Sequence, residues 1–498
     1  MRNRFAYFRP VIDYLALLSW VFGLLLLVPL VVRFVAPGPA EVPAAVYWAP
    51  AALALVAGAV LKRSLRFPAL DTRRAMMICA LGWIVVSAIG AIPFLGVGMS
   101  PVDAYFESVS GFTTTGITMI QGIENLPRSI LFWRSFIQWL GGLGILTFFL
   151  AILYTSGSAH RIFSAEGHKV FSKRPAPGIF HTLRILWTVY AVYTVAVAVL
   201  LALEGLSVFD AAAHAMTCLS TGGYSPHDLS IGYYRANADA YPHYRLIEYT
   251  VTLGMLLGGI NFFVHFRVLT GGVRALWDSL EMRLWWLFVA GAAAVIMLDH
   301  YRASPGAGFE AGGVEPVFRT CLFQTVAILT TTGFATQDIN SAYFPAAARQ
   351  VFLALMVIGG CVGSTGGGIK VLRIGVLLKM VGRHVRRLVY GPAAVNPVVV
   401  DGDVVVTDEL RRVSALFFAW IAFIVFGGLV TALLSGHDAL SSASGMFSAM
   451  GNIGPSYLSV AEMSALNPVV KIVYVLGMLA GRLEILPLLI LFSPRTWR

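Results

Sequence analysis

Long apolar runs alternate with polar stretches along the whole chain. A run of about 20 apolar residues is long enough to cross a bilayer as a helix. The pattern predicts ten transmembrane helices, at residues 14–32, 44–61, 75–97, 130–154, 182–203, 246–269, 284–299, 346–380, 413–435 and 467–492. The eighth run is too long for one simple span, and a glycine-rich stretch interrupts it.

Four shorter apolar stretches lie between these runs, at residues 101–113, 207–219, 317–330 and 438–451. At roughly 12 to 14 residues they are too short to span, and their length is typical of re-entrant segments. Each ends in a polar motif that contains glycine. We therefore expect four re-entrant pore helices, each followed by an irregular polar segment.

The four polar motifs are copies of one pattern. They read Thr113-Thr114-Thr115-Gly116-Ile117, Leu219-Ser220-Thr221-Gly222-Gly223, Thr330-Thr331-Thr332-Gly333-Phe334 and Gly451-Asn452-Ile453-Gly454-Pro455. Aligned on Gly116, Gly222, Gly333 and Gly454, they recur roughly every 110 residues, and such a period indicates a repeated structural unit. A pair of small residues follows each motif in the next run, at Gly141-Gly142, Gly258-Gly259, Gly359-Gly360 and Ala480-Gly481.

The predicted fold class is an all-α polytopic membrane protein. Four parallel repeats of helix, pore loop and helix surround one pore, and two extra N-terminal helices precede them. The expected boundaries are 1–68 for these two helices, then 69–160, 161–278, 279–400 and 401–498 for the four repeats.

Composition and charge agree with a membrane protein. Apolar residues make up 58% of the chain and charged residues only 12%, whereas a soluble domain carries about 25% charged residues. Most Lys and Arg fall on one side of the predicted spans, and this bias predicts a cytoplasmic N-terminus. The net charge of +11 reflects the same bias and does not indicate nucleic-acid binding. The first run exceeds the roughly 7 to 15 apolar residues of a secretory signal, which favours a retained helix. The four cysteines are scattered and predict neither a disulfide framework nor a metal site.

The motifs suit a cation path. Irregular backbone at membrane depth is tolerated where protein buries it or where it lines a water-filled cavity. Converging segments can offer backbone carbonyls in place of a cation's hydration shell, and glycine permits the positive φ that aligned carbonyls need. The candidate filter residues are Thr114, Thr115, Gly116, Ile117, Ser220, Thr221, Gly222, Gly223, Thr331, Thr332, Gly333, Phe334, Asn452, Ile453, Gly454 and Pro455.

The chain resembles the TrkH/TrkG family of potassium-uptake proteins over nearly its whole length. The resemblance rests on the four motifs, on residues 359–370 and on Gly481-Arg482-Leu483-Glu484. The resemblance implies potassium as the transported ion and a multi-pass protein of the bacterial inner membrane. It also implies a homodimer and a cytosolic TrkA-like regulatory ring that binds NAD or ATP. Glycine at the four aligned positions is what the resemblance associates with potassium. The fourth copy departs from the pattern at Asn452-Ile453.

The glycine-rich stretch predicts an unwound loop, and the resemblance implies that this loop is a gate. Residues 359–370 hold six glycines, and each glycine costs a helix about 1 kcal/mol relative to alanine, so we expect an unwound loop. The resemblance implies that this loop moves below the filter. A phosphate-binding P-loop does not fit, because Ile369 stands where that pattern needs glycine. The candidate gate residues are Gly359, Gly360, Gly363, Ser364, Thr365, Gly366, Gly367, Gly368, Lys370 and Arg482.

Arg482 is a charge inside an otherwise apolar run, and such residues usually face the protein interior or water. The resemblance supports a positive barrier on the pore axis. The alternative is a structural ion pair, although Glu484 is two residues away and does not share its helix face.

Potassium uptake is the leading function. The alternative is a secondary transporter for another cation or solute, coupled to protons or sodium. Many of those carry inverted repeats, whereas these repeats are parallel. We do not expect an enzyme, because no HExxH motif, GxSxG motif or paired intramembrane carboxylates occur. The sequence leaves ion coupling and channel-like conduction both open.

Two sets of polar residues have simpler interpretations. The basic inner segments 155–184, 267–283 and 381–412 are candidate docking surfaces for an intracellular partner, or they reflect the inward charge bias alone. The isolated residues Gln138, His214, Asn261 and His265 are expected to bond buried backbone or neighbouring helices.

Overall fold

The structure is a computed structural model that describes residues 2–38, 41–61, 71–144, 179–303, 313–390, 396–483 and 485–497. This part is predominantly helical, and its strands are β1 (Val399–Val400) and β2 (Asp403–Val404), which pair antiparallel. Three expectations fall outside the described residues: the end of the fourth predicted span beyond residue 144, most of the inner segment 155–184, and Glu484.

The helices lie close to their predicted positions. The N-terminal region contains α1 (Arg2–Leu25), α2 (Val28–Val35) and α3 (Ala45–Leu61). We keep the word repeat for the four predicted segments, and the first of them contains α4 (Thr72–Leu95), α5 (Pro101–Phe112), η1 (Ile123–Asn125), α6 (Arg128–Trp139) and the π-turn η2 (Leu140–Gly144). The second contains α9 (Ile179–Leu203), α10 (Val208–Leu219), α11 (Gly232–Ala236), α12 (Tyr244–Gly259), α13 (Phe262–Leu269) and η4 (Val273–Leu276).

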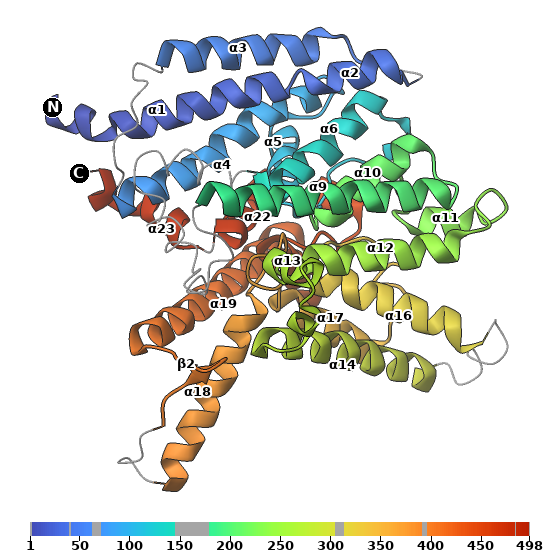
Figure 1. Cartoon of the computed structure of the whole chain (residues 1–498). Helices are drawn as coiled ribbons and strands as arrows, with labels where there is room; N and C mark the ends of the chain where they lie inside the picture. Colours follow the sequence, from blue (N-terminus) through green and yellow to red (C-terminus); the bar gives the residue numbers. More distant parts are fainter. Residues whose placement is uncertain are drawn as a thin grey trace.

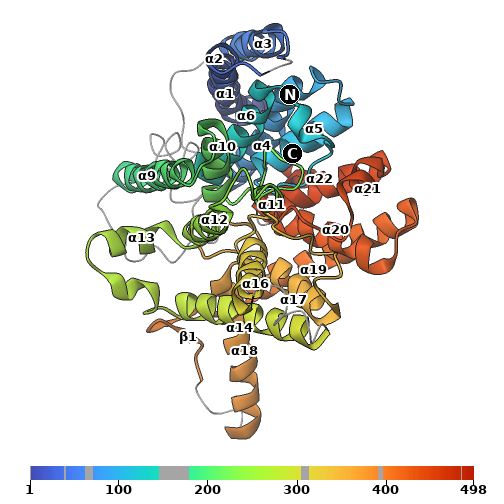
Figure 2. The same ribbon diagram turned by 90° about the vertical axis from the view of Figure 1, so that its right-hand side faces the viewer.

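The third repeat contains α14 (Leu280–Ala303), α16 (Val314–Leu329), α17 (Ala346–Val357) and α18 (Val371–Tyr390). The fourth contains α19 (Thr407–Ser435), α20 (Ala439–Gly451), α21 (Val460–Ala465), α22 (Pro468–Leu483), α23 (Leu486–Phe492) and η5 (Pro494–Trp497). Figure 1 shows α1 and α3 as an outer layer, and Figures 1 and 2 both show α18 extending away from the other helices.

Five described helices are long and apolar enough to cross a membrane: Tyr7–Val35, Arg73–Leu95, Leu183–Leu203, Leu280–Ala303 and Thr407–Ser435. The bent pair α12 and α13 makes a sixth if it is counted as one span. The remaining predicted spans consist of shorter or interrupted helices, so the count of ten stays a prediction.

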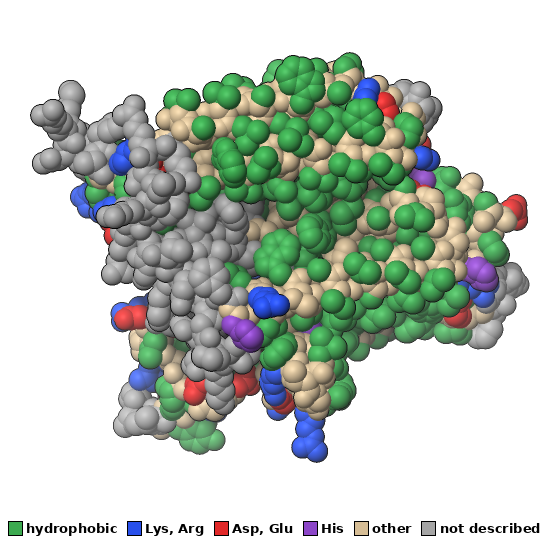
Figure 3. Space-filling model, turned by 45° about the horizontal axis from the view of Figure 1, so that its top comes forward, with side chains coloured by type: hydrophobic (Ala, Val, Ile, Leu, Met, Phe, Trp, Pro, Cys, Tyr) green, Lys and Arg blue, Asp and Glu red, His purple; other side chains and the backbone are tan. Residues whose placement is uncertain are grey.

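The outer surface of the long helices is apolar. Val195 on α9 is 62% exposed, and Phe418 and Leu433 on α19 are 78% and 72% exposed. Figure 3 shows hydrophobic side chains across the broad face, with charged side chains toward its ends. A contiguous apolar surface of this size would be unfavourable in water, which identifies it as the surface that faces lipid.

Three of the four short helices begin at side-chain caps. The hydroxyl of Ser100 accepts the Asp103 amide at 3.2 Å, and that of Ser207 accepts the Asp210 amide at 3.0 Å. In the fourth repeat the Asp438 carboxylate accepts the Leu440 amide at 3.0 Å. Each cap satisfies an amide that the first turn leaves without an intrahelical partner, and so sets where the helix starts.

The second helix of each repeat departs from regular α-helical geometry near its small pair. Sequence analysis predicted a break in the third repeat alone, and it did not predict the breaks within the runs 246–269 and 467–492. α12 and α13 are bent by 106°, α22 gives way to α23 around Ile485, and α6 ends in the π-turn η2. The small residues lie against the ends of the short helices. A Cβ on Gly258 would be 2.9 Å from the Leu219 carbonyl oxygen, and one on Gly141 or Gly481 would collide with the carbonyl of Phe112 or Met450.

Candidate ion site

The four polar motifs adopt one backbone conformation. We call residues 113–117, 220–224, 330–334 and 451–455 the ring segments. In each, a non-glycine residue just past the short helix has a left-handed φ: Thr114 at 54°, Thr221 at 54°, Thr331 at 60° and Asn452 at 54°. Two residues later a glycine also has positive φ: Gly116 at 81°, Gly223 at 75°, Gly333 at 77° and Gly454 at 106°.

This geometry corrects the alignment of the second copy. The residue equivalent to Gly116, Gly333 and Gly454 is Gly223, and the predicted choice of Gly222 is wrong by one position. The hydrogen bonds agree, because Gly116, Gly223 and Gly333 each face a carbonyl within the short helix before them, that of Ser110, Thr217 and Ala327. Gly222 therefore corresponds to Thr115, Thr332 and Ile453.

The ring segments meet one another in cyclic order. A Cβ on Gly116 would collide with the carbonyl oxygen of Gly222, one on Gly223 with that of Thr332, and one on Gly333 with that of Ile453. A Cβ on Gly454 would lie 3.0 Å from the carbonyl oxygen of Thr115, which closes the cycle. Four equivalent carbonyls, which we call the ring carbonyls, therefore sit at the four junctions. They belong to Thr115, Gly222, Thr332 and Ile453.

Side chains hold the segments in this conformation. The hydroxyls of Thr113 and Thr115 are 2.7 Å apart, and those of Thr330 and Thr332 are also 2.7 Å apart. The Asn452 amide donates to the Thr115 hydroxyl and to the Met478 carbonyl, both at 2.9 Å. The departure of the fourth copy thus links the fourth segment to the first.

The arrangement offers carbonyl and hydroxyl oxygens and no carboxylate within the ring segments. α5, α10, α16 and α20 all end at the ring, so the negative ends of their dipoles favour a cation there. Oxygen ligands of this type can replace the hydration shell of a monovalent cation.

The predicted unwound loop lies directly against the ring segments. α17 ends at Val357 and α18 begins at Val371, so residues 358–370 form the glycine-rich loop. The Thr365 hydroxyl donates to the carbonyls of Leu219 and Gly258 at 2.9 and 3.0 Å. The Gly367 amide donates to the Thr331 hydroxyl at 2.7 Å. The loop therefore contacts the second and third repeats.

Glu281, at the start of α14, ties the loop to the first turn of α18. Its carboxylate accepts the Val362 amide at 2.7 Å and the Leu372 amide at 3.3 Å. Sequence analysis did not identify this residue, because its role depends on a loop about 80 residues away along the chain.

Arg482 links the loop to the first repeat. Its guanidinium donates to the Thr365 carbonyl at 2.6 Å and to the carbonyls of Gly141 and Gly142 at 2.6 and 2.7 Å. The last two carbonyls belong to the π-turn that follows α6 in the first repeat. Arg482 thus lies next to the loop, and its charge stabilises the carbonyls of Gly141 and Gly142.

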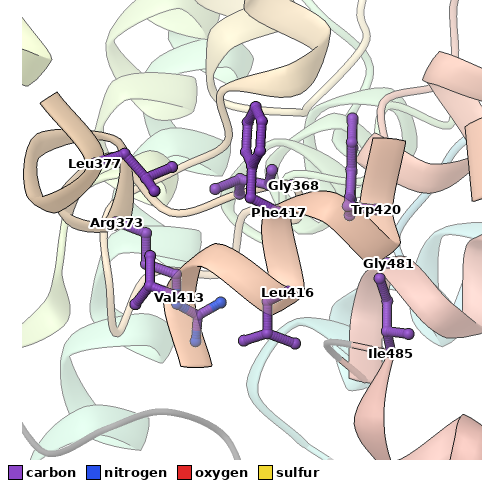
Figure 4. A pocket seen from close by; sticks show the side chains of 10 residues that line it. Gly368, Arg373, Leu377, Val413, Leu416, Phe417, Trp420, Gly481 and Ile485 are labelled. Carbon is purple, nitrogen blue, oxygen red and sulfur yellow. The ribbon is translucent and has the colours of Figure 1, made fainter. Parts of the chain in front are cut away.

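A small pocket lies beside the end of the loop (Figure 4). Its walls are apolar apart from Arg373. The lining residues are Gly368, Ile369, Arg373, Leu377, Val413, Leu416, Phe417, Trp420, Gly481 and Ile485. The end of the loop, at Gly368 and Ile369, therefore borders this small pocket.

The isolated polar residues bond backbone, which confirms that prediction. Gln138 bonds the Gly222 carbonyl and the Tyr224 amide. Asn261 caps α13 through the Phe263 amide, His265 faces the Leu257 carbonyl at 2.8 Å, and His214 faces the Asp210 carbonyl at 2.9 Å.

Buried ion pairs hold the short helices α5 and α16 to neighbouring elements, and sequence analysis missed them. Arg134 and Glu107 are 3.0 Å apart with side chains 2% and 0% exposed. Glu248 lies 2.8 Å from Arg235 and 2.6 Å from Arg319. The signal available in the sequence was that Glu107 and Glu248 are charges within or beside apolar runs. The partners lie elsewhere in the chain, so only folding identifies them.

Replacing Glu107 with glutamine is expected to destabilise the protein by about 3–5 kcal/mol, because it leaves the buried Arg134 charge without a counter-ion. Thermal unfolding in detergent measures this as a lower midpoint. Asp408→Asn is the matched control, because Asp408 pairs with Arg411 at an exposed site, and its midpoint should not move. Equal midpoints for the two variants would contradict the expectation.

Comparisons with known proteins agree with this architecture. The family model described as "TrkH: Cation transport protein" matches residues 47–298 and 313–498. The Trk system potassium uptake protein TrkH of Vibrio parahaemolyticus is 36% identical over 444 residues, covering 86% of this chain and 87% of the relative. The Trk system potassium uptake protein TrkG of Escherichia coli is 33% identical over 436 residues, covering 86% of each. The crystal structure of the potassium transporter TrkH from Vibrio parahaemolyticus matches with a TM-score of 0.85 at 32% identity, covering 99% of this chain and 100% of that chain.

Fold and site together define a membrane protein of the cation-transport class, whose relatives are transporters and not enzymes. This chain belongs to the TrkH family.

Proposed function

We propose that this protein takes up potassium ions across the bacterial inner membrane. The ion passes through a path surrounded by four parallel repeats, with two additional N-terminal helices outside them. In this proposal ten helices span the membrane, and the N-terminus is cytoplasmic. The observation that carries the proposal is the closed cycle of contacts between Gly116, Gly223, Gly333, Gly454 and the neighbouring ring carbonyls.

In this proposal the ring segments are the selectivity filter, and potassium is the transported substrate. Carbonyl and threonine oxygens replace its hydration shell. Support comes from the absence of carboxylates in the ring segments, which suits a weakly held monovalent ion that must also leave. The filter residues are the sixteen proposed from the sequence, with Gly223 taking the place of Gly222 as the equivalent of Gly116.

The glycine-rich loop and Arg482 form the gate in this proposal. The loop touches the second and third repeats, and Arg482 ties it to the first, so it closes the inner side of the ring. A small pocket lies beside the loop at Gly368 and Ile369. Lys370 also reaches back to the Gly366 carbonyl.

Regulation is proposed to come from a cytosolic TrkA-like ring that binds NAD or ATP, with the membrane protein acting as a homodimer. Support comes from the position of α18, which extends away from the body and carries Arg383, Arg386 and Arg387 (Figure 2). This helix holds part of the basic segment 381–412 predicted as a docking surface.

Cation flux into liposomes tests the proposal. Purified protein should admit potassium and rubidium faster than sodium, in the absence of a pH gradient. Equal sodium and potassium flux would refute potassium selectivity. Flux that requires a proton or sodium gradient would instead support the secondary-transporter alternative.

A further inference from the structure

The carboxamide of Gln138 contacts one of the four ring carbonyls directly. Gln138 lies on α6 and is fully buried. Its Nε2 donates to the Gly222 carbonyl at 2.6 Å, and its Oε1 accepts the Tyr224 amide at 3.0 Å. The two hydrogen bonds of the carboxamide therefore lie on either side of Gly223, the glycine with positive φ in the second ring segment.

This contact explains the glycine at position 222. The left-handed residues of the second segment are Thr221 and Gly223, so backbone conformation does not demand glycine at 222. A Cβ at this position would instead collide with the Gln138 carboxamide. The equivalent residues Thr115 and Thr332 carry side chains that bond Thr113 and Thr330. In the second segment the Gln138 side chain occupies that space.

The arrangement occurs at one junction. The equivalent residues of the second helices, three positions before Gly141, Gly258, Gly359 and Gly481, are Gln138, Met255, Met356 and Met478, so one repeat of the four has an amide there. Gln324 makes a similar pair of hydrogen bonds in the third segment, but it bonds the carbonyl of Phe334 at 3.4 Å and the amide of Thr336 at 3.2 Å. That carbonyl lies beyond the ring carbonyl of Thr332.

We infer that Gln138 is a specificity-determining positioning residue for the transported cation. The inference rests on the proposed function of the ring. A donor at 2.6 Å occupies a lone pair of the Gly222 oxygen and holds it in place. This oxygen cannot move inward to coordinate a smaller ion as closely as a free carbonyl could. The ring carbonyl of Gly222 therefore discriminates against sodium more strongly than the other three ring carbonyls do.

Gln138→Met tests this inference, because methionine stands at the equivalent position of the next two repeats. The potassium-to-sodium flux ratio in liposomes is expected to fall about three- to tenfold, the factor that one hydrogen bond of ordinary strength represents. Potassium flux itself should persist. Gln324→Met is the matched comparison, and its flux ratio should change less.

A double variant separates selectivity from folding. Gly222→Thr alone should abolish flux, because the new side chain collides with Gln138. Gln138→Met combined with Gly222→Thr places methionine and threonine at the positions equivalent to Met255 and Thr332, and it should restore potassium flux. Gel filtration and thermal unfolding in detergent establish that each variant is folded.

The outcomes are distinct. An unchanged flux ratio in folded Gln138→Met overturns the inference, as does a double variant no more active than Gly222→Thr. If the wild-type protein fails to discriminate potassium from sodium, the proposed function itself is refuted, and this inference with it.

Discussion

Replacing Gly333 with alanine is expected to abolish cation flux. Gly333 has a φ of 77°, which costs a residue with a side chain roughly 1–2 kcal/mol. The added methyl group would also collide with the Ile453 carbonyl oxygen and lie 2.7 Å from Cδ of Pro455. The third and fourth ring segments would have to separate, which would displace the ring carbonyl between them. Rubidium uptake into liposomes measures the loss.

Gly98→Ala is the control that isolates the collision from the backbone cost. Gly98 has a similar φ of 84°, but an added Cβ there meets nothing within 4 Å. This variant should keep its flux, with a small loss of stability. Wild-type rubidium uptake by folded Gly333→Ala would show that the cyclic contact does not shape the ion path.

Replacing Arg482 with alanine is expected to raise cation flux by about tenfold or more. The variant loses three hydrogen bonds from a charged donor to Thr365, Gly141 and Gly142, each worth about 1.5–3 kcal/mol, and 1.4 kcal/mol corresponds to a factor of ten. The loop is then free to leave the ring. Removal of the positive charge also lowers the electrostatic barrier to a cation.

Arg482→Lys separates the two contributions. Lysine keeps the charge, but its single ammonium cannot reproduce the planar fork that reaches carbonyls in two repeats. If the hydrogen bonds from Arg482 to the loop and to the first repeat dominate, the flux of the lysine variant should approach that of the alanine variant. If the positive charge dominates, the flux of the lysine variant should stay near that of the wild type. Flux in Arg482→Ala no greater than in the wild type would remove Arg482 from the gate.

Helix positions were predictable from sequence because hydropathy is a local property. The runs 101–113 and 207–219 became α5 and α10, since an apolar stretch between polar caps defines a helix without knowledge of its neighbours. The unwound loop was predictable for the same reason, because consecutive glycines weaken a helix wherever they occur. Arg482 was recognisable as a single charge within an apolar run.

The alignment of the second copy was not predictable. Gly222 and Gly223 are adjacent and identical, and only the backbone conformation separates them. Glycine at 223 is required by φ, whereas glycine at 222 is required by the side chain of Gln138 from another helix. A motif in the sequence does not distinguish these two causes.

The sequence by itself therefore determined the helices, the four related motifs, the interrupting loop and the exceptional arginine, because each depends on residues close together in the chain. Tertiary structure alone decided the cyclic contacts of the ring segments, the breaks in the second helices, and the partners of Glu107, Glu281 and Arg482. These features depend on steric fit and hydrogen bonding between segments far apart in the chain. They exist only once the repeats have packed against one another.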